Sequence, residues 1–213
     1  KGKVILEATS GNTGISIAWV AALKGYQCEI VLPASVSEER KKIMKALGAK
    51  LRLVSTEAEA IRTAREKAKS SQYFLTDQFA NEMNWKTHYE TTAMEVWRQT
   101  EGKITHFVAG IGTSGTLIGV ARKLKELKKD IQIVGVQPSR PNNKQQGLLN
   151  LQEFYPKICE HEEWDEMIMV EDEDAARTAR ELLLKEGLFV GISSGSTMWA
   201  TIQKAKQLSR GLI

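Results

Sequence analysis

Three short segments of the sequence are dense in glycine and in hydroxyl-bearing residues, and each has the composition of an anion-binding turn. They are residues 9–14 (TSGNTG), 110–116 (GIGTSGT) and 191–196 (GISSGS). Glycine lets a ligand approach the backbone, the hydroxyls add donors, and the helix-like run after each segment directs free N–H groups back toward it. One such segment is equally typical of an N-capped helix start, whereas three in one chain indicate a binding site.

The elements expected to position these segments alternate along the chain. Strand-like apolar runs cover residues 4–8, 28–32, 50–54, 73–75, 104–109, 131–136, 167–170 and a shorter run, 188–190. Helical periodicity covers residues 15–24, 37–47, 57–71, 87–100, 117–127, 174–186 and 197–208. The repeated order of strand and helix predicts a three-layer α/β fold, with parallel sheets and helices on both faces. Because loops at the carboxyl ends of parallel strands share one edge, we expect the three segments to gather there.

Two lobes are expected, residues 1–83 and 84–213, because the rhythm of strands and helices breaks at residues 81–84. The first lobe carries the segment at residues 9–14 and is expected to be mobile, and the second lobe carries the other two segments. A second irregular stretch, residues 138–155, contains two prolines, paired asparagines and paired glutamines. This composition predicts a surface excursion or an entrance flap.

Composition excludes several classes of protein. The 213 residues are 42% hydrophobic and 26% charged, which is normal for a soluble globular protein. No apolar run approaches the ~18 residues of a membrane helix and no signal peptide opens the chain, so we expect a cytoplasmic protein that binds no membrane. The net charge of +4 is spread over mixed-sign helix faces and predicts no nucleic-acid partner. Cys28 and Cys159 lack metal-ligand spacing and are expected to be buried thiols, so no metal is predicted.

Residues 110–115 also spell G-x-G-x-x-G between a strand and a helix, the pattern of a dinucleotide-binding turn. That site needs an acid about 20 residues further on, at the tip of the next strand. Here the next strand ends in Gln137-Pro138. Thr113, Ser114 and Thr116 instead form a hydroxyl-lined cup that suits a terminal phosphate, which disfavours an NAD-binding Rossmann domain. His88 and His106 are expected on a helix and in a strand, as structural histidines.

The three segments resemble the signature loops of the pyridoxal-phosphate enzymes of fold type II. The likeness is greatest to the cysteine synthase (O-acetylserine sulfhydrylase) branch, in particular its B-like form, with cystathionine β-synthase as a relative. It extends through residues 22–26, 48–49, 77–79, 104–108 and 186–187, in the order of the family. The resemblance therefore covers essentially the whole chain.

The resemblance implies a role for each segment. The cofactor phosphate would be held by Gly112, Thr113, Ser114, Gly115 and Thr116. Asn12 would bond the phenolic oxygen of pyridoxal 5'-phosphate, and Ser193 its pyridine nitrogen. A hydroxyl at that nitrogen moderates the electron sink and favours removal of the α-proton and loss of a β-substituent. The carboxylate of the amino-acid substrate would be held by Thr9, Ser10, Gly11, Thr13 and Gln78.

The implied activity is cysteine biosynthesis, in which O-acetyl-L-serine and sulfide give L-cysteine and acetate. The implied assembly is a homodimer, with serine acetyltransferase as a partner. Two alternatives stay open: a lyase similar to cystathionine β-synthase, and a catalytically inactive fragment of the cofactor fold that binds a partner.

The sequence departs from the family's pattern in one respect. The family's Schiff-base lysine lies in a segment of the Ser-x-Lys-Asp-Arg type well before the first loop, and this sequence opens at Lys1-Gly2-Lys3. No lysine here matches that position, so no catalytic residue is assigned. The sequence resembles the middle of the enzyme, and the expectation is that the parent protein is active whereas this portion alone has no turnover.

Overall fold

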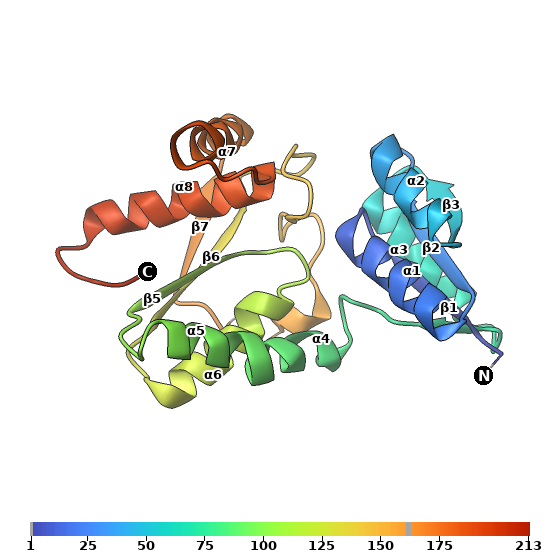
Figure 1. Cartoon of the computed structure of the whole chain (residues 1–213), viewed down its shortest axis with the longest axis horizontal. Helices are drawn as coiled ribbons and strands as arrows, with labels where there is room; N and C mark the ends of the chain where they lie inside the picture. Colours follow the sequence, from blue (N-terminus) through green and yellow to red (C-terminus); the bar gives the residue numbers. More distant parts are fainter. Residues whose placement is uncertain (1, 161–162) are drawn as a thin grey trace. The chain divides into compact units, whose positions relative to one another are not determined.

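The chain forms two compact units, one ending at Gln78 and the other beginning at Phe79. The computed structural model describes residues 2–160 and 163–213, and Figure 1 labels its helices and strands. The sequence predicted the boundary after residue 83. Phe79 belongs to the second unit because its ring packs edge-on against Phe154, with centroids 5.1 Å apart, and its carbonyl accepts a hydrogen bond from the Ile158 N–H.

The first unit is a four-stranded parallel sheet with the strand order β3-β2-β1-β4. Its elements are β1 (Val4–Ala8), α1 (Asn12–Lys24), β2 (Cys28–Pro33), α2 (Glu38–Ala46), β3 (Lys50–Val54), α3 (Glu57–Lys67) and β4 (Tyr73–Leu75). The inner strand β2 is buried along its whole length, as an apolar run in a parallel sheet should be. Helices α1 and α2 pack together, and α3 packs on all four strands. Right-handed crossovers put α3 on the face opposite α1 and α2.

The second unit contains a three-stranded parallel sheet with the order β5-β6-β7. Its strands are β5 (His106–Gly110), β6 (Gln132–Pro138) and β7 (Glu166–Val170), and its longer helices are α6 (Gly115–Leu127), α7 (Asp172–Glu186) and α8 (Ile192–Gln207). Figure 1 shows α6 on one face of the sheet and α8, with α7 beside it, on the other. The core divides accordingly: Leu117 and Ile133 belong to the cluster under α6, and Val136 and Ala200 to the cluster under α8. The predicted parallel α/β fold is confirmed.

A continuous helical segment that includes one π-helical turn packs on α6. It consists of α4 (Glu82–Thr87), the π-helical turn η1 (His88–Thr92) and α5 (Ala93–Gln99). The expected irregular stretch at residues 81–84 is wrong, because Asn81 caps α4 by accepting a hydrogen bond from the Met83 N–H at 3.0 Å. A Cβ atom on Gly119 of α6 would lie 2.2 Å from the Trp85 carbonyl oxygen, so the glycine permits this close crossing. Across the residues described, no helix has the length and apolar character that a membrane span requires.

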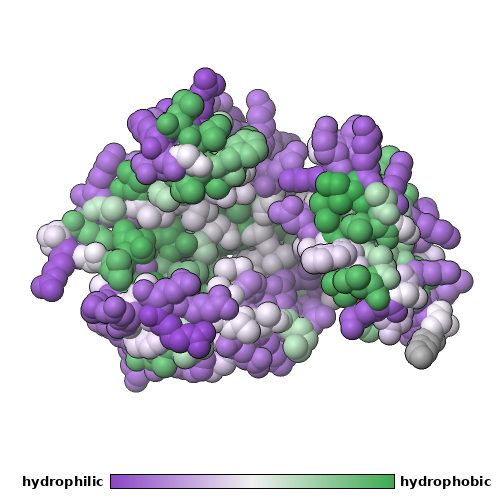
Figure 2. All heavy atoms as spheres, viewed as in Figure 1, coloured by the Kyte–Doolittle hydropathy of each residue, from purple (hydrophilic) through white to green (hydrophobic). Residues whose placement is uncertain are grey.

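The predicted strand at residues 188–190 is also wrong. Gly187 ends α7 in the left-handed conformation at φ 69°, and the chain then runs to α8 without pairing with any described strand. Its side chains remain exposed, Phe189 to 89%. Figure 2 shows hydrophobic side chains on the surface of α7 and α8.

The stretch from residue 138 to 155 is attached to the second unit by buried amides, where a surface excursion or flap was predicted. Gln145 is fully buried and donates hydrogen bonds to the Val170 carbonyl at 2.8 Å and to Asp172 at 3.0 Å. Asn150 is also buried and donates to the Pro138 carbonyl at 2.8 Å. The 3-10 turn η2 (Lys157–Cys159) follows just beyond its end.

Candidate functional site

The first predicted segment lies at the carboxyl end of β1, where the chain turns into α1. Gly11 is the N-cap of the helix, and its N–H donates to Thr9 Oγ1 at 3.1 Å. Thr9 itself is buried, whereas Asn12 is exposed at the first position of the helix. Arg40 Nη1 donates to the Ser10 carbonyl at 3.2 Å. These contacts hold the turn in place while its side chains at positions 10 and 12 stay accessible.

Two predicted substrate residues, far apart in the sequence, bond directly. Thr13 Oγ1 donates to Gln78 Oε1 at 2.8 Å, and Gln78 Nε2 donates to the Ala8 carbonyl at 2.8 Å. The second bond fixes the orientation of the amide, so its oxygen faces the Thr13 hydroxyl. The first unit therefore joins Gln78 to the turn at residues 9–14.

A buried carboxylate beneath this turn was not predicted. Glu7 lies in β1 and accepts hydrogen bonds from the Ala8 N–H at 2.8 Å, the Gln78 N–H at 3.1 Å and the Thr76 hydroxyl. Burial raises the pKa of Glu7, and the three donors oppose that rise. The carboxylate thus links the end of β1 to the backbone that positions Gln78.

The second predicted segment connects β5 to α6. Ser114 is the N-cap of α6 and has the left-handed backbone conformation, with φ 70°. Within the described part of the chain, no acceptor is found for the backbone N–H groups of Gly112, Thr113 and Ser114. Successive unpaired N–H groups in a turn before a helix form a concave anion site. The donor set therefore fits a phosphate group.

Two glycines of this segment are required by packing within the protein. A Cβ atom on Gly115 would lie 1.9 Å from Asn84 Oδ1, and one on Gly112 would lie 2.5 Å from the Gly147 carbonyl oxygen. Asn84 Nδ2 also donates to Thr113 Oγ1 at 2.9 Å. Residues from α4 and from the stretch at 138–155 thus support the segment from two sides.

His88 supports the first turn of α6. Its Nε2 lies 3.2 Å from Thr116 Oγ1, and its Nδ1 lies 2.9 Å from Thr92 Oγ1. Burial lowers the pKa of His88, which favours the neutral imidazole. His106 lies in β5, as predicted. Its pKa is also lowered, first by burial and to a smaller extent by the positive charge of Lys204.

The third predicted segment forms the first turn of α8. Its Ser193 carbonyl accepts a hydrogen bond from Thr197 Oγ1 at 3.1 Å, and no partner for its hydroxyl is found among the residues described. Ser196 is fully buried, and its Oγ likewise has no partner there. A Cβ atom on Gly110 would lie 3.1 Å from Thr197 Oγ1, so the second and third segments are neighbours in the second unit.

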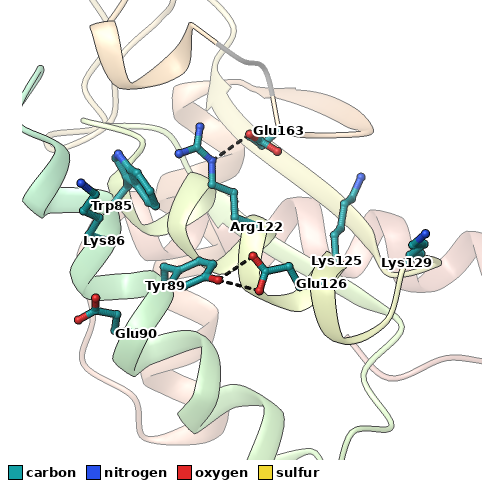
Figure 3. A pocket seen from close by; sticks show the side chains of 9 residues that line it. All are labelled: Trp85, Lys86, Tyr89, Glu90, Arg122, Lys125, Glu126, Lys129 and Glu163. Carbon is teal, nitrogen blue, oxygen red and sulfur yellow. Dashed lines mark hydrogen bonds and ion pairs between the residues drawn. The ribbon is translucent and has the colours of Figure 1, made fainter.

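A groove of about 660 Å³ lies elsewhere on the second unit and contains none of the predicted site residues (Figure 3). Its side chains largely bond one another: Tyr89 donates to Glu126 at 2.6 Å, and Arg122 to Glu163 at 2.9 Å. It is lined by Trp85, Lys86, Tyr89, Glu90, Arg122, Lys125, Glu126, Lys129 and Glu163. We assign it no ligand.

The predicted site residues are divided between the two units. The first unit contains Asn12 and the five predicted substrate residues, and the second contains the other six predicted cofactor residues. His88 was predicted to be a structural histidine, and its bonds to Thr92 and Thr116 agree with this. The supporting roles of Glu7 and Asn84 were not predicted, because their contacts cross between separate elements. No local pattern reveals such contacts.

The sequence matches one family along its whole length. A family model described as pyridoxal-phosphate dependent enzyme matches residues 1–213. The chain is 48% identical to a cysteine synthase of Aquifex aeolicus, covering 99% of this chain and 66% of that protein. It is 43% identical to cysteine synthase B of Escherichia coli, covering 96% of this chain and 69% of that protein. It is 39% identical to a cystathionine β-synthase of Apis mellifera, covering 97% and 45%.

Solved structures resemble the chain over nearly all of its residues. A hydrogen sulfide-producing enzyme of Fusobacterium nucleatum superposes with a TM-score of 0.92 at 35% identity, covering 99% of this chain and 75% of that one. Cysteine synthase of Entamoeba histolytica superposes with a TM-score of 0.85 at 38% identity, covering 96% and 64%. The chain spans about two thirds of the length of the cysteine synthases it matches.

Proposed function

Because the chain belongs to the family of pyridoxal-phosphate dependent enzymes, we propose that its protein makes L-cysteine from O-acetyl-L-serine and sulfide. The family expected from the three segments is confirmed, together with the parallel α/β fold. The observation that carries the proposal is the match along nearly the whole chain to relatives named cysteine synthase. The reaction replaces the acetoxy group on Cβ by a thiol and releases acetate.

The phosphate of the cofactor binds to the turn before α6. Gly112, Thr113 and Ser114 provide backbone N–H groups without protein acceptors among the described residues, and the helix dipole favours an anion at that end. Thr116, in the first turn of α6, adds a hydroxyl that His88 orients. Gly115 keeps this turn in contact with Asn84.

Ser193 binds the pyridine nitrogen of the cofactor, and Asn12 its phenolic oxygen. The Ser193 hydroxyl is without a partner in the described chain and sits at the start of α8. When bound, pyridoxal phosphate withdraws electrons from Cα of the amino acid, which eases loss of the α-proton and of the β-substituent. A neutral hydroxyl at the ring nitrogen limits this withdrawal and so favours β-replacement.

The α-carboxylate of the substrate binds to the turn at the end of β1. The residues assigned to it are Thr9, Ser10, Gly11, Thr13 and Gln78. The Gly11 N–H now donates to Thr9 Oγ1 and the Thr13 hydroxyl to Gln78, so these donors would turn to the carboxylate when it binds. A carboxylate that accepts several such bonds is held in one orientation. The turn thereby orients the carbon that bears the acetoxy group.

A second function deserves a test because a cystathionine β-synthase also matches nearly the whole chain. In that reaction the thiol of homocysteine replaces the hydroxyl of serine. We expect the whole protein to which this chain belongs, supplied with pyridoxal phosphate, to form cysteine from O-acetyl-L-serine and sulfide faster than cystathionine from serine and homocysteine. Chromatography of both products after equal incubation decides between them. Cystathionine as the faster product would favour the second function, and neither product would contradict both.

Replacing Thr13 by alanine should weaken substrate binding while leaving the cofactor content unchanged. The change removes the hydroxyl that bonds Gln78, but no backbone donor of the second unit. Adding O-acetyl-L-serine or L-cysteine should shift the cofactor absorbance, and the variant should need roughly tenfold more ligand for half of the shift.

The matched control is Thr56→Ala, which removes a helix-capping hydroxyl in the same unit. It should lower stability by about 1 kcal/mol without altering the ligand titration. Equal loss of cofactor and of substrate response in Thr13→Ala would show that the turn serves the cofactor or the fold instead.

Membership of this family also leads to proposals about the assembly and the cellular location of the protein. We propose a homodimer in the cytoplasm that associates with serine acetyltransferase, an enzyme that supplies O-acetyl-L-serine. Light scattering on the purified protein tests the dimer.

A further inference from the structure

We propose that Cys159 is a positioning residue that holds the phosphate-binding turn through the hydroxyl of Ser114. The inference rests on the proposed cofactor site and assigns to it a residue outside the three segments. Cys159 Sγ lies 2.7 Å from Ser114 Oγ, although the two residues are 45 positions apart. Both side chains are buried, Cys159 completely.

The contact made by the Ser114 hydroxyl also affects the backbone of the turn before α6. It caps α6, yet its side chain makes no capping bond to the helix, because the hydroxyl points to the thiol instead. Its φ of 70° lies in the left-handed region, which non-glycine residues adopt at a cost in free energy. A contact that restrains its side chain therefore also restrains the direction of the N–H groups on either side.

Cys159 is itself held firmly. It ends the turn η2, its N–H donates to the Pro156 carbonyl at 2.9 Å, and its carbonyl accepts from the Tyr155 hydroxyl at 3.0 Å. The neighbouring Ile158 N–H donates to the Phe79 carbonyl at 3.3 Å. The thiol is thus presented to Ser114 from a fixed backbone.

Residues that follow η2 also bond α6 further along the helix. Arg122 donates to Glu163 at 2.9 Å, a pair drawn in Figure 3, and Lys125 donates to Asp165 at 2.6 Å. With the contact at Ser114, side chains from η2 to the start of β7 hold α6 at its N-terminus and along its length. Of these three contacts, the one between Cys159 and Ser114 reaches the turn at residues 110–116, the proposed phosphate-binding turn.

The test compares Cys159→Ala and Cys159→Ser with Cys28→Ala in the purified protein. Cys28 is also a buried thiol, but it lies in β2, within the hydrophobic core of the first unit. The dissociation constant of pyridoxal phosphate should rise about fivefold in Cys159→Ala, as expected for one buried hydrogen bond. It should stay near the wild-type value in Cys159→Ser, whose hydroxyl restores a polar partner, and in Cys28→Ala.

Phosphorus-31 NMR of the bound cofactor gives a second readout that a general loss of stability would not move. The phosphate resonance should shift or broaden in Cys159→Ala and not in Cys28→Ala. Adding Ser114→Ala to Cys159→Ala should lower the affinity for pyridoxal phosphate no further, because both changes remove the same contact.

Independent, additive losses, or equal losses in Cys159→Ala and Cys28→Ala, would overturn the inference. So would an unchanged affinity in Cys159→Ala while the wild type binds the cofactor. If the wild type fails to bind pyridoxal phosphate, the proposed function is overturned along with the inference built on it.

Discussion

A Gly115→Ala variant should lose pyridoxal phosphate, with an affinity roughly 100-fold below that of the wild type. The added Cβ would lie 1.9 Å from Asn84 Oδ1 and 2.5 Å from its Cγ, far inside van der Waals contact. Either α6 moves away from α4, which displaces the N–H groups before the helix, or Asn84 turns away. The second response breaks its bond to Thr113 Oγ1. Both responses would damage the turn at residues 110–116, where we propose that the cofactor phosphate binds.

Equilibrium dialysis with cofactor absorbance measures this loss, and two further variants identify its cause. Gly135→Ala also crowds the second unit, but against the flexible end of Met167 in the sheet, and should lower stability while retaining the cofactor. Adding Asn84→Ala to Gly115→Ala removes the colliding atoms and should recover part of the affinity. Full cofactor binding by Gly115→Ala would contradict the close contact between Asn84 and the turn.

Local sequence features were sufficient to locate most helices and strands. β1, β3 and β4 have the predicted bounds, because short apolar runs between polar turns are strong indicators of strands, even where the strand is partly exposed, as β3 and β4 are. The helix start at residues 81–84 was missed because Asn81 is typical of both turns and N-caps. Residues 188–190 have a strand-like composition but no described neighbour to pair with. Pairing is a tertiary property that composition does not reveal.

In the candidate site, too, the features set by local sequence were predictable and those set by tertiary packing were not. The three segments were visible because small and hydroxyl-bearing residues cluster at helix starts. The reasons for individual glycines were less visible: Gly115 was expected to make room for an anion, whereas in the structure it also makes room for Asn84. The contacts of Glu7 with Gln78 and of His88 with Thr116 depend on how separate elements pack. One sequence alone does not specify such contacts.

Gly195 is the position at which the third segment depends most on packing. A Cβ atom there would lie 2.1 Å from the Ala175 carbonyl oxygen and 2.6 Å from the Ala179 amide nitrogen. Both atoms belong to the backbone of α7, so no side-chain rotation can relieve the collision. Helices α7 and α8 would have to separate, and Ser193, in the first turn of α8, would move with its helix.

We therefore expect Gly195→Ala to lower the free energy of unfolding by about 3 kcal/mol, as overpacking against a rigid backbone does. Denaturant unfolding of the purified protein measures this loss. Gly191→Ala is the matched control in the same segment, because its Cβ would meet nothing nearer than Ser193 Oγ at 3.8 Å and its φ is −75°. That variant should unfold as the wild type does. Equal stability of the two variants would show that α7 and α8 are not packed as closely at Gly195 as the structure describes.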